Sequence, residues 1–244
     1  MGKLPVKHNP YLHDLIWDLL KDLPRGALLD IPSGPGYFAR HAAENGFSPV
    51  AAEIDQSLHV FPEVDYRRAD MSRVLPFDDG SFDYVVSIEG IEHVENQSSF
   101  LRECFRVLKS GGRLLLTTPN TSSLENRFTF FLTGIHETPT KPIRDDLPNA
   151  FMEHTNLIPF YRLETYLRFA GFKIETLTTY RYRKGSRFMY PFIYPFAWLR
   201  LRNTFARYFK DEPESDKYRE ILRMYLSREV LCGSHVVVVA TKVR

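Results

Sequence analysis

Leu28-Leu29-Asp30-Ile31-Pro32-Ser33-Gly34-Pro35-Gly36 contains an apolar run that ends in a turn of glycine and proline residues. The run predicts a short strand over residues 27–31, and a helix is predicted from about Tyr37 to Asn45. Gly34 and Gly36 lack a Cβ, so the backbone can adopt positive φ and approach a ligand closely. A strand, a glycine-rich turn and a helix in this order are typical of the ligand-binding edge of an open α/β sheet.

Strands and helices alternate along most of the remaining chain. Apolar runs predict strands at 49–54, 82–88, 113–118, 172–178 and 235–241. The helical spacing of apolar residues predicts helices at 11–23, 98–108 and 163–170. Such alternation implies right-handed crossovers and a mainly parallel sheet with helices on both faces. The expected fold is therefore α/β, Rossmann-like and doubly wound.

The domain organisation follows from the chain length and from the breaks in this alternation. We expect a single domain over residues 1–244, with an N-terminal helix within residues 1–25. Residues 119–160 form a long connection beside the expected active site, and residues 181–230 form an insertion or cap before the last strand. Connections of this length usually carry function or cover a site.

The composition is that of an ordinary globular protein and argues against several classes. The formal charge of +2, from 32 Lys and Arg against 30 Asp and Glu, does not suggest a dedicated nucleic-acid binder. Cys104 and Cys232 cannot build a disulfide framework and fit a reducing compartment. The first residues lack the apolar core of a signal peptide, and no run reaches ~18 apolar residues. We expect a cytoplasmic protein that is at most peripheral to a membrane.

A second carboxylate follows the second predicted strand. Asp55 lies nineteen residues after Gly36 (55 − 36), where a carboxylate can accept both hydroxyls of a ribose. Glu53, two residues earlier, is expected to be exposed or to lie behind Asp55. A nicotinamide-binding enzyme is the main alternative at this point, because Ala39 is tolerated in place of the third glycine of that fingerprint.

Further short motifs follow in a fixed order. They are Ala69-Asp70-Met71, residues 75–83, Ile91-Glu92-His93-Val94 and residues 106–113. The complete series resembles the class I S-adenosylmethionine-dependent methyltransferases over residues 26–178 and the final strand, and it argues against the nicotinamide alternative. The resemblance implies a seven-stranded sheet whose last strand is antiparallel, with an aromatic-rich helical insertion before that strand.

The resemblance also implies a role for each residue of an S-adenosylmethionine site. It implies that the methionine part of the cofactor is surrounded by Asp30, Ser33, Gly34 and Gly36. It implies that the ribose is held by Asp55, with Gln56 beside it, and that the adenine contacts Asp70 and Met71. It also implies that Ser87 and Ile88 line the floor of the site under the methyl group.

Three positions in this assignment have alternatives. Pro32 stands where the family usually has a glycine, and because proline fixes φ and removes a donor, the turn must differ slightly. Asp30 could merely cap the following helix. Asp70 could be only a turn former.

Glu89-Gly90-Ile91-Glu92-His93 follows the fourth strand, at the mouth of the expected site. In a helix, Glu89, Glu92 and His93 would share one face, which suits Mg²⁺ or another divalent cation. With the distant His154, the pattern resembles the metal site of the small-RNA 2′-O-methyltransferases, and its first part is similar to the ubiquinone-pathway O-methyltransferases. The resemblance implies a metal that holds the acceptor oxygens and lowers the pKa of the hydroxyl.

The same residues also have an interpretation without a metal. Glu-His-Val after this strand is common in methyltransferases that use no metal, where it caps or packs locally. His93 or His154 would then be the general base, because a neutral imidazole accepts protons near neutral pH. Glu92 is the third candidate catalytic residue.

The insertion contains the aromatic run Phe188-Met-Tyr-Pro-Phe-Ile-Tyr-Pro-Phe-Ala-Trp-Leu199, with arginine and lysine residues on both sides. The first interpretation is a lid over the acceptor pocket or internal packing. Such a run is also similar to elements that sit among lipid headgroups, so a peripheral membrane contact or a lipid-linked substrate at residues 181–210 is an alternative, as is a dimer contact. Nucleic acid is a less attractive partner, because the acidic stretch 211–216 follows.

The expected reaction is O-methylation of a hydroxyl on a glycan, a glycolipid or a small polyol or aromatic acceptor. Residues 118–134 and the later His-Thr-Asn-Leu-Ile-Pro look like methyltransferases of surface-polysaccharide and lipid-carrier pathways. The alternatives are a methyltransferase-like binding module without turnover and an RNA 2′-O-methyltransferase. The sequence fixes neither the methyl acceptor nor the oligomeric state.

Overall fold

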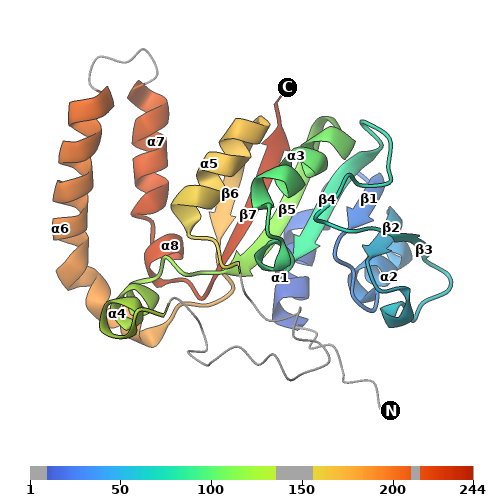
Figure 1. Ribbon diagram of the computed structural model, residues 1–244, viewed down its shortest axis with the longest axis horizontal. Helices are drawn as coiled ribbons and strands as arrows, with labels where there is room; N and C mark the ends of the chain where they lie inside the picture. Colours follow the sequence, from blue (N-terminus) through green and yellow to red (C-terminus); the bar gives the residue numbers. More distant parts are fainter. Residues whose placement is uncertain (1–9, 136–155, 210–214, 244) are drawn as a thin grey trace.

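The computed structural model describes residues 10–135, 156–209 and 215–243 of the chain. Its centre is a seven-stranded sheet with the strand order β3-β2-β1-β4-β5-β7-β6 (Figure 1). The strands are β1 Ala27–Asp30, β2 Ser48–Glu53, β3 Asp65–Arg68, β4 Phe82–Ile88, β5 Leu108–Pro119, β6 Phe172–Thr178 and β7 His235–Lys242. β7 runs antiparallel to both β5 and β6, and the pairs among β1 to β5 are parallel. The expected Rossmann-like sheet with an antiparallel last strand is confirmed.

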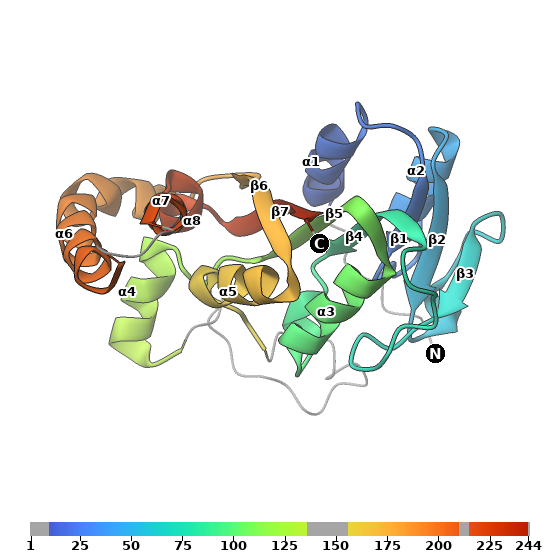
Figure 2. The same cartoon turned by 90° about the horizontal axis from the view of Figure 1, so that it is seen from above.

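Helices cover both faces of this sheet, as Figure 2 shows from above. The helices are α1 Pro10–Leu20, α2 Tyr37–Glu44, α3 Gln97–Val107, α4 Leu124–Thr133, α5 Phe160–Ala170, α6 Lys184–Phe209, α7 Ser215–Tyr225 and α8 Arg228–Cys232. Two short 3-10 turns are η1 Gln56–Leu58 and η2 Ile91–His93. α1 and α2 lie on one face of the sheet, and α3 and α5 lie on the other.

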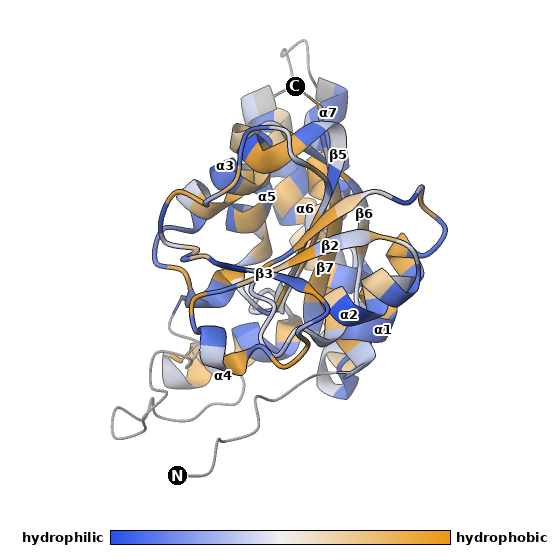
Figure 3. Cartoon of the chain, turned by 90° about the vertical axis from the view of Figure 1, so that its right-hand side faces the viewer, coloured by the Kyte–Doolittle hydropathy of each residue, from blue (hydrophilic) through white to orange (hydrophobic). Residues whose placement is uncertain are grey.

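Two apolar cores result from the alternation of side chains along the strands. Leu28 packs with Phe38 of α2 on one face, and the neighbouring Leu29 packs with Phe100 of α3 on the other. All four side chains are buried. In Figure 3 the central strands, such as β7, are coloured hydrophobic, whereas the covering helices carry both colours. The sheet is therefore the rigid element that positions everything at its edges.

The insertion before the last strand is helical, as expected, and forms a lobe beside the sheet. α6 and α7 form an antiparallel hairpin next to α4 and α8, and α6 is the outermost element on that side (Figures 1 and 2). A separate apolar cluster around Leu124, Leu226 and Leu231 holds this lobe together. In the described ranges, no helix is both long and apolar enough to cross a membrane.

Candidate active site

The candidate site lies at the edge of the sheet where the parallel strands end. β1 ends at Asp30, β2 at Glu53 and β4 at Ile88, and each of these ends is followed by one of the motifs found in the sequence. In Figure 1 the arrowheads of β4 and β6 point to this lower edge. Ligands of open α/β sheets bind at this edge because the loops that follow the strands converge there.

The glycine-rich turn is held between two strands. Ile31 N donates to Val86 O over 2.9 Å, and Ser33 N donates to Ala52 O over 2.9 Å. Gly34 and Gly36 have φ values of 51° and 91°, in the left-handed region that favours glycine. A Cβ at Gly36 would also lie 3.1 Å from His59 Nδ1. The backbone amides of the turn are thereby set at the start of α2, where an anionic or polar ligand group is favoured.

Pro32 fits this turn because position 90 is a glycine. A Cβ at Gly90 would overlap Pro32 Cδ and would lie 3.0 Å from Ser87 Oγ. The Ile31–Pro32 peptide bond is cis. Pro32 and Gly90 are thus a complementary pair that joins the turn after β1 to the segment after β4.

Asp30 is buried at the end of β1, and its Oδ2 accepts a hydrogen bond from Ala39 N of α2 over 3.1 Å. This is the helix-capping contact that the sequence left open. Burial, together with the nearby charge of Glu53, raises the pKa of Asp30 to about 8, although the hydrogen bond from Ala39 N opposes the rise. Its predicted contact with the methionine part of the cofactor stays a prediction.

Glu53 and Asp55 differ in burial: Glu53 is buried, whereas Asp55, the residue predicted to bind the ribose, is exposed. Glu53 ends β2 and is buried, with Oε2 accepting from Gly34 N over 3.0 Å and Oε1 accepting from Ile54 N over 2.8 Å. Burial raises its pKa. Asp55 is exposed, and its Oδ1 accepts from Ser57 N over 2.9 Å as the cap of η1, which begins at Gln56. The carboxylate that touches the glycine turn is therefore Glu53.

Asp70 and Met71 follow β3 in a turn. Asp70 Oδ1 accepts from Ser72 N over 2.8 Å, and Asp70 Oδ2 lies 3.2 Å from Arg73 Nε. The alternative role of Asp70 as a turn former is therefore present in the structure. Met71 is partly buried against the core beneath α3. The predicted adenine contacts of both residues stay predictions.

Two buried hydroxyls give a test of whether a polar ligand fits here. Ser33 Oγ in the turn and Ser87 Oγ near the end of β4 are buried, and neither has a hydrogen-bond partner in the described part of the chain. Ser87 Oγ lies beside the Pro32–Gly90 contact. Buried hydroxyls are rarely left unpaired in a folded protein. A ligand with several polar atoms, such as S-adenosylmethionine, fits this pair, with Ile88 partly buried next to Ser87.

Glu89 forms a pair with a histidine that the sequence analysis missed. Glu89 Oε2 lies 3.2 Å from Nε2 of His235, the first residue of β7, and Thr117 Oγ1 donates to Glu89 Oε1 over 3.3 Å. Both side chains of the pair keep some exposure, at 24% for Glu89 and 15% for His235. Glu89 has a φ of 52°, which places a non-glycine residue in a costly conformation and is typical of functional sites. No local motif marks His235, because only the pairing of β7 with β5 brings it near Glu89, which follows β4.

Glu92 and His93 do not share a helix with Glu89, and that expectation is wrong. The segment forms only the 3-10 turn η2 over Ile91–His93, and Gly90 separates Glu89 from it. Glu92 is completely buried, and its Oε2 accepts from Thr118 Oγ1 over 3.1 Å. Burial raises the pKa of Glu92 well above its ordinary value, and the charge of Glu89 raises it further. Glu92 therefore lies inside the protein and accepts from Thr118 rather than facing the same side as Glu89.

The expected metal group is incomplete among the described residues. His154 lies outside them, and within residues 10–135, 156–209 and 215–243 no three His, Cys, Asp or Glu side chains come together as a metal-binding group. Asn156 N donates to Glu92 O over 3.1 Å, so the chain beyond residue 155 returns beside η2. The proposed ligation by Glu89, Glu92, His93 and His154 stays a prediction.

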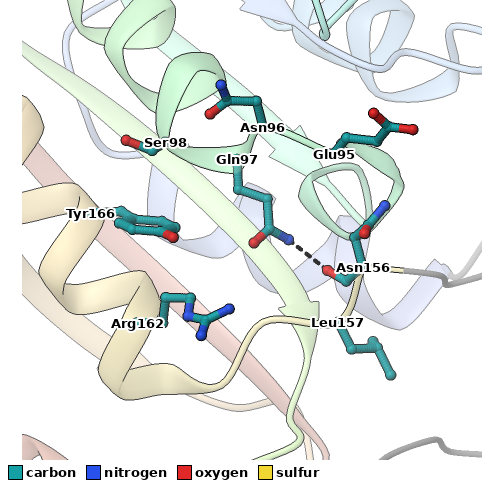
Figure 4. Close-up of a pocket in the computed structure, with 8 residues that line it drawn as sticks. All are labelled: Glu95, Asn96, Gln97, Ser98, Asn156, Leu157, Arg162 and Tyr166. Atoms are coloured by element: carbon teal, nitrogen blue, oxygen red, sulfur yellow. Dashed lines mark hydrogen bonds between the residues drawn. The ribbon is translucent and has the colours of Figure 1, made fainter.

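A cavity of about 480 Å³ lies beside this region, between the start of α3 and α5 (Figure 4). Gln97 and Arg162 are among the residues that line it, and Gln97 Nε2 donates to Asn156 O over 2.5 Å across one wall. None of the predicted cofactor residues lines this cavity. It therefore neighbours the candidate site without being the cofactor site.

Comparison with known proteins agrees with this geometry. A family model described as a methyltransferase domain matches residues 29–116, which span the turn, β4 and most of β5. A probable S-adenosylmethionine-dependent methyltransferase of Mycolicibacterium smegmatis is 33% identical over 169 residues, covering 67% of this chain and 58% of that protein. The chain belongs to the class I S-adenosylmethionine-dependent methyltransferase family. It spans about half the length of the first curated relatives that it matches.

Other relatives of this methyltransferase chain extend the comparison. A ubiquinone biosynthesis O-methyltransferase of Xanthomonas axonopodis is 28% identical over 165 residues, covering 64% of this chain and 66% of that protein. A solved S-adenosylmethionine-dependent methyltransferase from Archaeoglobus fulgidus has a TM-score of 0.55 at 16% identity, with 94% of each chain covered. The solved cyclase SpnF has a TM-score of 0.54 at 21% identity, covering 95% of this chain and 79% of that one. These two structures share the fold with this chain.

Proposed function

We propose that this chain is an O-methyltransferase that binds S-adenosylmethionine at the turn of residues 31–36 and methylates a hydroxyl beside Glu89 and His235. The observation that carries the proposal is the Glu89–His235 pair, 3.2 Å apart, directly after the strand whose Ser87 is buried without a partner. The ubiquinone biosynthesis O-methyltransferase among the relatives supports oxygen as the acceptor atom. A glycan, a glycolipid or another small polyol or aromatic compound is the proposed acceptor class.

Binding of the donor would use the residues that surround the turn. Ser33 and Ser87 would offer their unpaired hydroxyls to polar atoms of S-adenosylmethionine. Glu53 is our candidate for the ribose, rather than Asp55, because Glu53 ends the strand against Gly34 whereas Asp55 is exposed and already caps η1. A carboxylate at the end of the second strand is well placed to accept both ribose hydroxyls.

S-Adenosylmethionine supplies a methyl group on a sulfonium centre, so the protein needs to position the acceptor and take up its proton. The hydroxyl proton passes to the Glu89 carboxylate as the acceptor oxygen forms its bond to the methyl carbon. The carbon–sulfur bond breaks with its electron pair going to sulfur, which balances the step. His235, with a proton on Nε2, donates to the other carboxylate oxygen and holds Glu89 in place. Thr117 fixes the first carboxylate oxygen in the same way.

The ring of Tyr180 supports an acceptor with a flat or polyol face. Its centroid lies 5.0 Å from that of His235, and the ring of Tyr11 stacks on it with a centroid distance of 6.4 Å. Aromatic side chains next to polar groups are common in pockets that bind sugars and small organic acceptors. Tyr180 would therefore form one wall of the acceptor site.

The test is formation of S-adenosylhomocysteine with a panel of catechol, polyol and glycolipid acceptors, with and without a chelator. We expect acceptor-dependent turnover that chelation changes by less than about twofold, because Glu89 contacts His235 and Thr117 and Glu92 contacts Thr118. Binding of S-adenosylmethionine without turnover of any acceptor would favour a non-catalytic module or a different reaction on this fold. Turnover that chelation abolishes would restore the metal assignment.

A further inference from the structure

The outer face of α6 is apolar and aromatic although it points into solvent. Phe188, Phe192 and Phe196 follow one another at intervals of four residues and are 74%, 65% and 76% exposed, and Leu199 completes the row at 51%. Residues four apart lie on the same face of a helix. The rings of Phe188 and Phe192 lie 5.8 Å apart. We refer to these four residues as the aromatic row.

The opposite face of α6 is already packed, so the aromatic row cannot turn inward. Met189, Tyr190, Tyr194, Ala197 and Leu201 on that face join the cluster formed with α4, α7 and α8. Glu125 N of α4 donates to Ser186 Oγ over 3.0 Å and fixes the foot of the helix. A helix that is apolar on both faces needs a cover on each. The lobe covers one face of α6, and something outside this lobe must cover the other.

The charges on α6 indicate what kind of surface covers the row. The helix contains five exposed cations and no Asp or Glu, and the cations are Lys184, Arg187, Arg200, Arg202 and Arg207. By helical spacing, Lys184 and Arg202 border the row on one side, and Arg200 and Arg207 border it on the other. In the described part of the chain, none of the five forms an ion pair with an acidic residue. The guanidinium of Arg202 lies over the ring of Trp198, 4.9 Å from its centroid. Exposed aromatic side chains bordered by cations are typical of elements that lie among anionic lipid headgroups.

We infer that the aromatic row of α6 docks the protein on an anionic lipid bilayer. The four apolar side chains enter the interface and the bordering cations contact lipid phosphates. A second copy of the chain is a poorer occupant, because a two-fold interface would bring two sets of five cations together. α6 begins beside α4 at the same edge of the sheet as the candidate active site, so docking would hold that edge near a membrane.

The test is co-sedimentation of the full chain with vesicles of phosphatidylcholine alone and of phosphatidylcholine mixed with phosphatidylglycerol. We expect binding only to the anionic vesicles, weakened as NaCl is raised from about 0.1 to about 0.5 M. The double variant Phe192→Ser/Phe196→Ser should lose at least about tenfold in binding, because both rings leave the interface. Replacing Arg200 or Arg202 with Gln should cost about fivefold each.

The matched control is Phe169→Ser, since Phe169 on α5 is 75% exposed but lies outside the row. It should bind like the wild type, and circular dichroism should show that all variants are folded. Absence of binding to anionic vesicles, or equal loss in Phe169→Ser, would overturn the inference. The inference would also be overturned if the double variant still bound vesicles but lost self-association, or lost a salt-sensitive binding to RNA, that the wild type shows. None of these measurements needs S-adenosylmethionine, so they are independent of the proposed reaction.

Discussion

The turn of residues 31–36 and the outer face of α6 are opposite in construction. At the turn, polar groups are buried, and two hydroxyls, Ser33 and Ser87, lack partners in the described chain. On α6, large apolar groups are exposed, and the charged residues of the helix itself are all positive. The turn has buried polar groups without partners and α6 has apolar groups without a cover, so the two regions indicate chemically different partners. The first fits a small polar ligand, and the second fits an extended apolar surface with negative charge.

The residues proposed to bind the methyl donor and those proposed to meet the acceptor come from different parts of the chain. The donor half depends on strand ends and short turns, so its residues are grouped in local motifs between residues 30 and 93. The proposed acceptor site and the proposed membrane contact depend on β7 and on the helical lobe, which come from the end of the chain. If the comparison holds, variants of the two regions should affect different measurements.

The largest effect is expected from Glu89→Gln. Loss of the carboxylate removes the proton acceptor, and we expect kcat to fall by about 10²- to 10⁴-fold with unchanged affinity for S-adenosylmethionine. Single-turnover kinetics and calorimetric titration measure the two quantities. Glu175→Gln on the far strand β6 is the control. An equal loss of cofactor affinity in Glu89→Gln would assign Glu89 to donor binding instead.

The next largest effect separates Glu53 from Asp55. Glu53→Gln should weaken S-adenosylmethionine binding by about tenfold or more, because a charged acceptor for two hydroxyls is lost. Asp55→Asn should change it by no more than about twofold, because the exposed turn η1 can still be capped. Titration calorimetry on the two variants gives the answer. A larger loss of affinity in Asp55→Asn than in Glu53→Gln would show that Asp55 binds the ribose.

The complementary fit of Pro32 and Gly90 predicts a non-additive pair. Gly90→Ala should destabilise the fold by about 1–3 kcal/mol, because its Cβ overlaps the proline ring. Adding Pro32→Gly should recover part of that loss, since the ring is gone. Urea unfolding of the two single variants and the double variant measures the coupling free energy. Additive effects would show that the two positions are independent.

The smallest effect concerns the buried carboxyl of Asp30. Burial raises its pKa from the ordinary 3.8 to about 8, so between these pH values the folded state holds a proton that the unfolded state has lost. Stability should therefore fall as the pH rises from about 4 to about 8. Asp30→Asn removes this dependence and should raise the unfolding temperature by roughly 3–6 °C at pH 8, with little change at pH 5.

Exposed Asp216 offers the matched substitution for Asp30. Asp216→Asn should leave the unfolding temperature unaltered at both pH values, since its side chain is 92% exposed. A uniform shift in Asp30→Asn at pH 5 and pH 8 would indicate a change in packing rather than in proton binding.

Much of the fold could be predicted from apolar residues, which fill the central strand β4 and recur along the edge strand β6. The apolar runs at 82–88 and 172–178 coincide with β4 and β6. β3 could not be found this way, because this edge strand is only Asp-Tyr-Arg-Arg and buries little. The limits of β2 mattered more. The predicted strand ends at Ile54, one residue beyond the end of β2 at Glu53, and the role of Asp55 at the ribose stays a prediction.

The rest of the site depends on contacts between distant parts of the chain. Glu89, Glu92 and His93 were expected to share a helical face, but Gly90 and the left-handed Glu89 replace that helix with η2. His235 has no local signal, since only the pairing of β7 with β5 brings it to Glu89. The predicted roles of Gln56, Asp70, Met71 and Ile88 concern contacts with a ligand, which no sequence pattern can measure.

The most direct measurement is a crystal structure of the chain with bound S-adenosylhomocysteine. The account predicts the ribose hydroxyls on Glu53, polar atoms of the ligand on Ser33 and Ser87, and the sulfur facing Glu89 and His235. A ligand whose ribose lies on Asp55, or whose sulfur faces away from the Glu89–His235 pair, would contradict it.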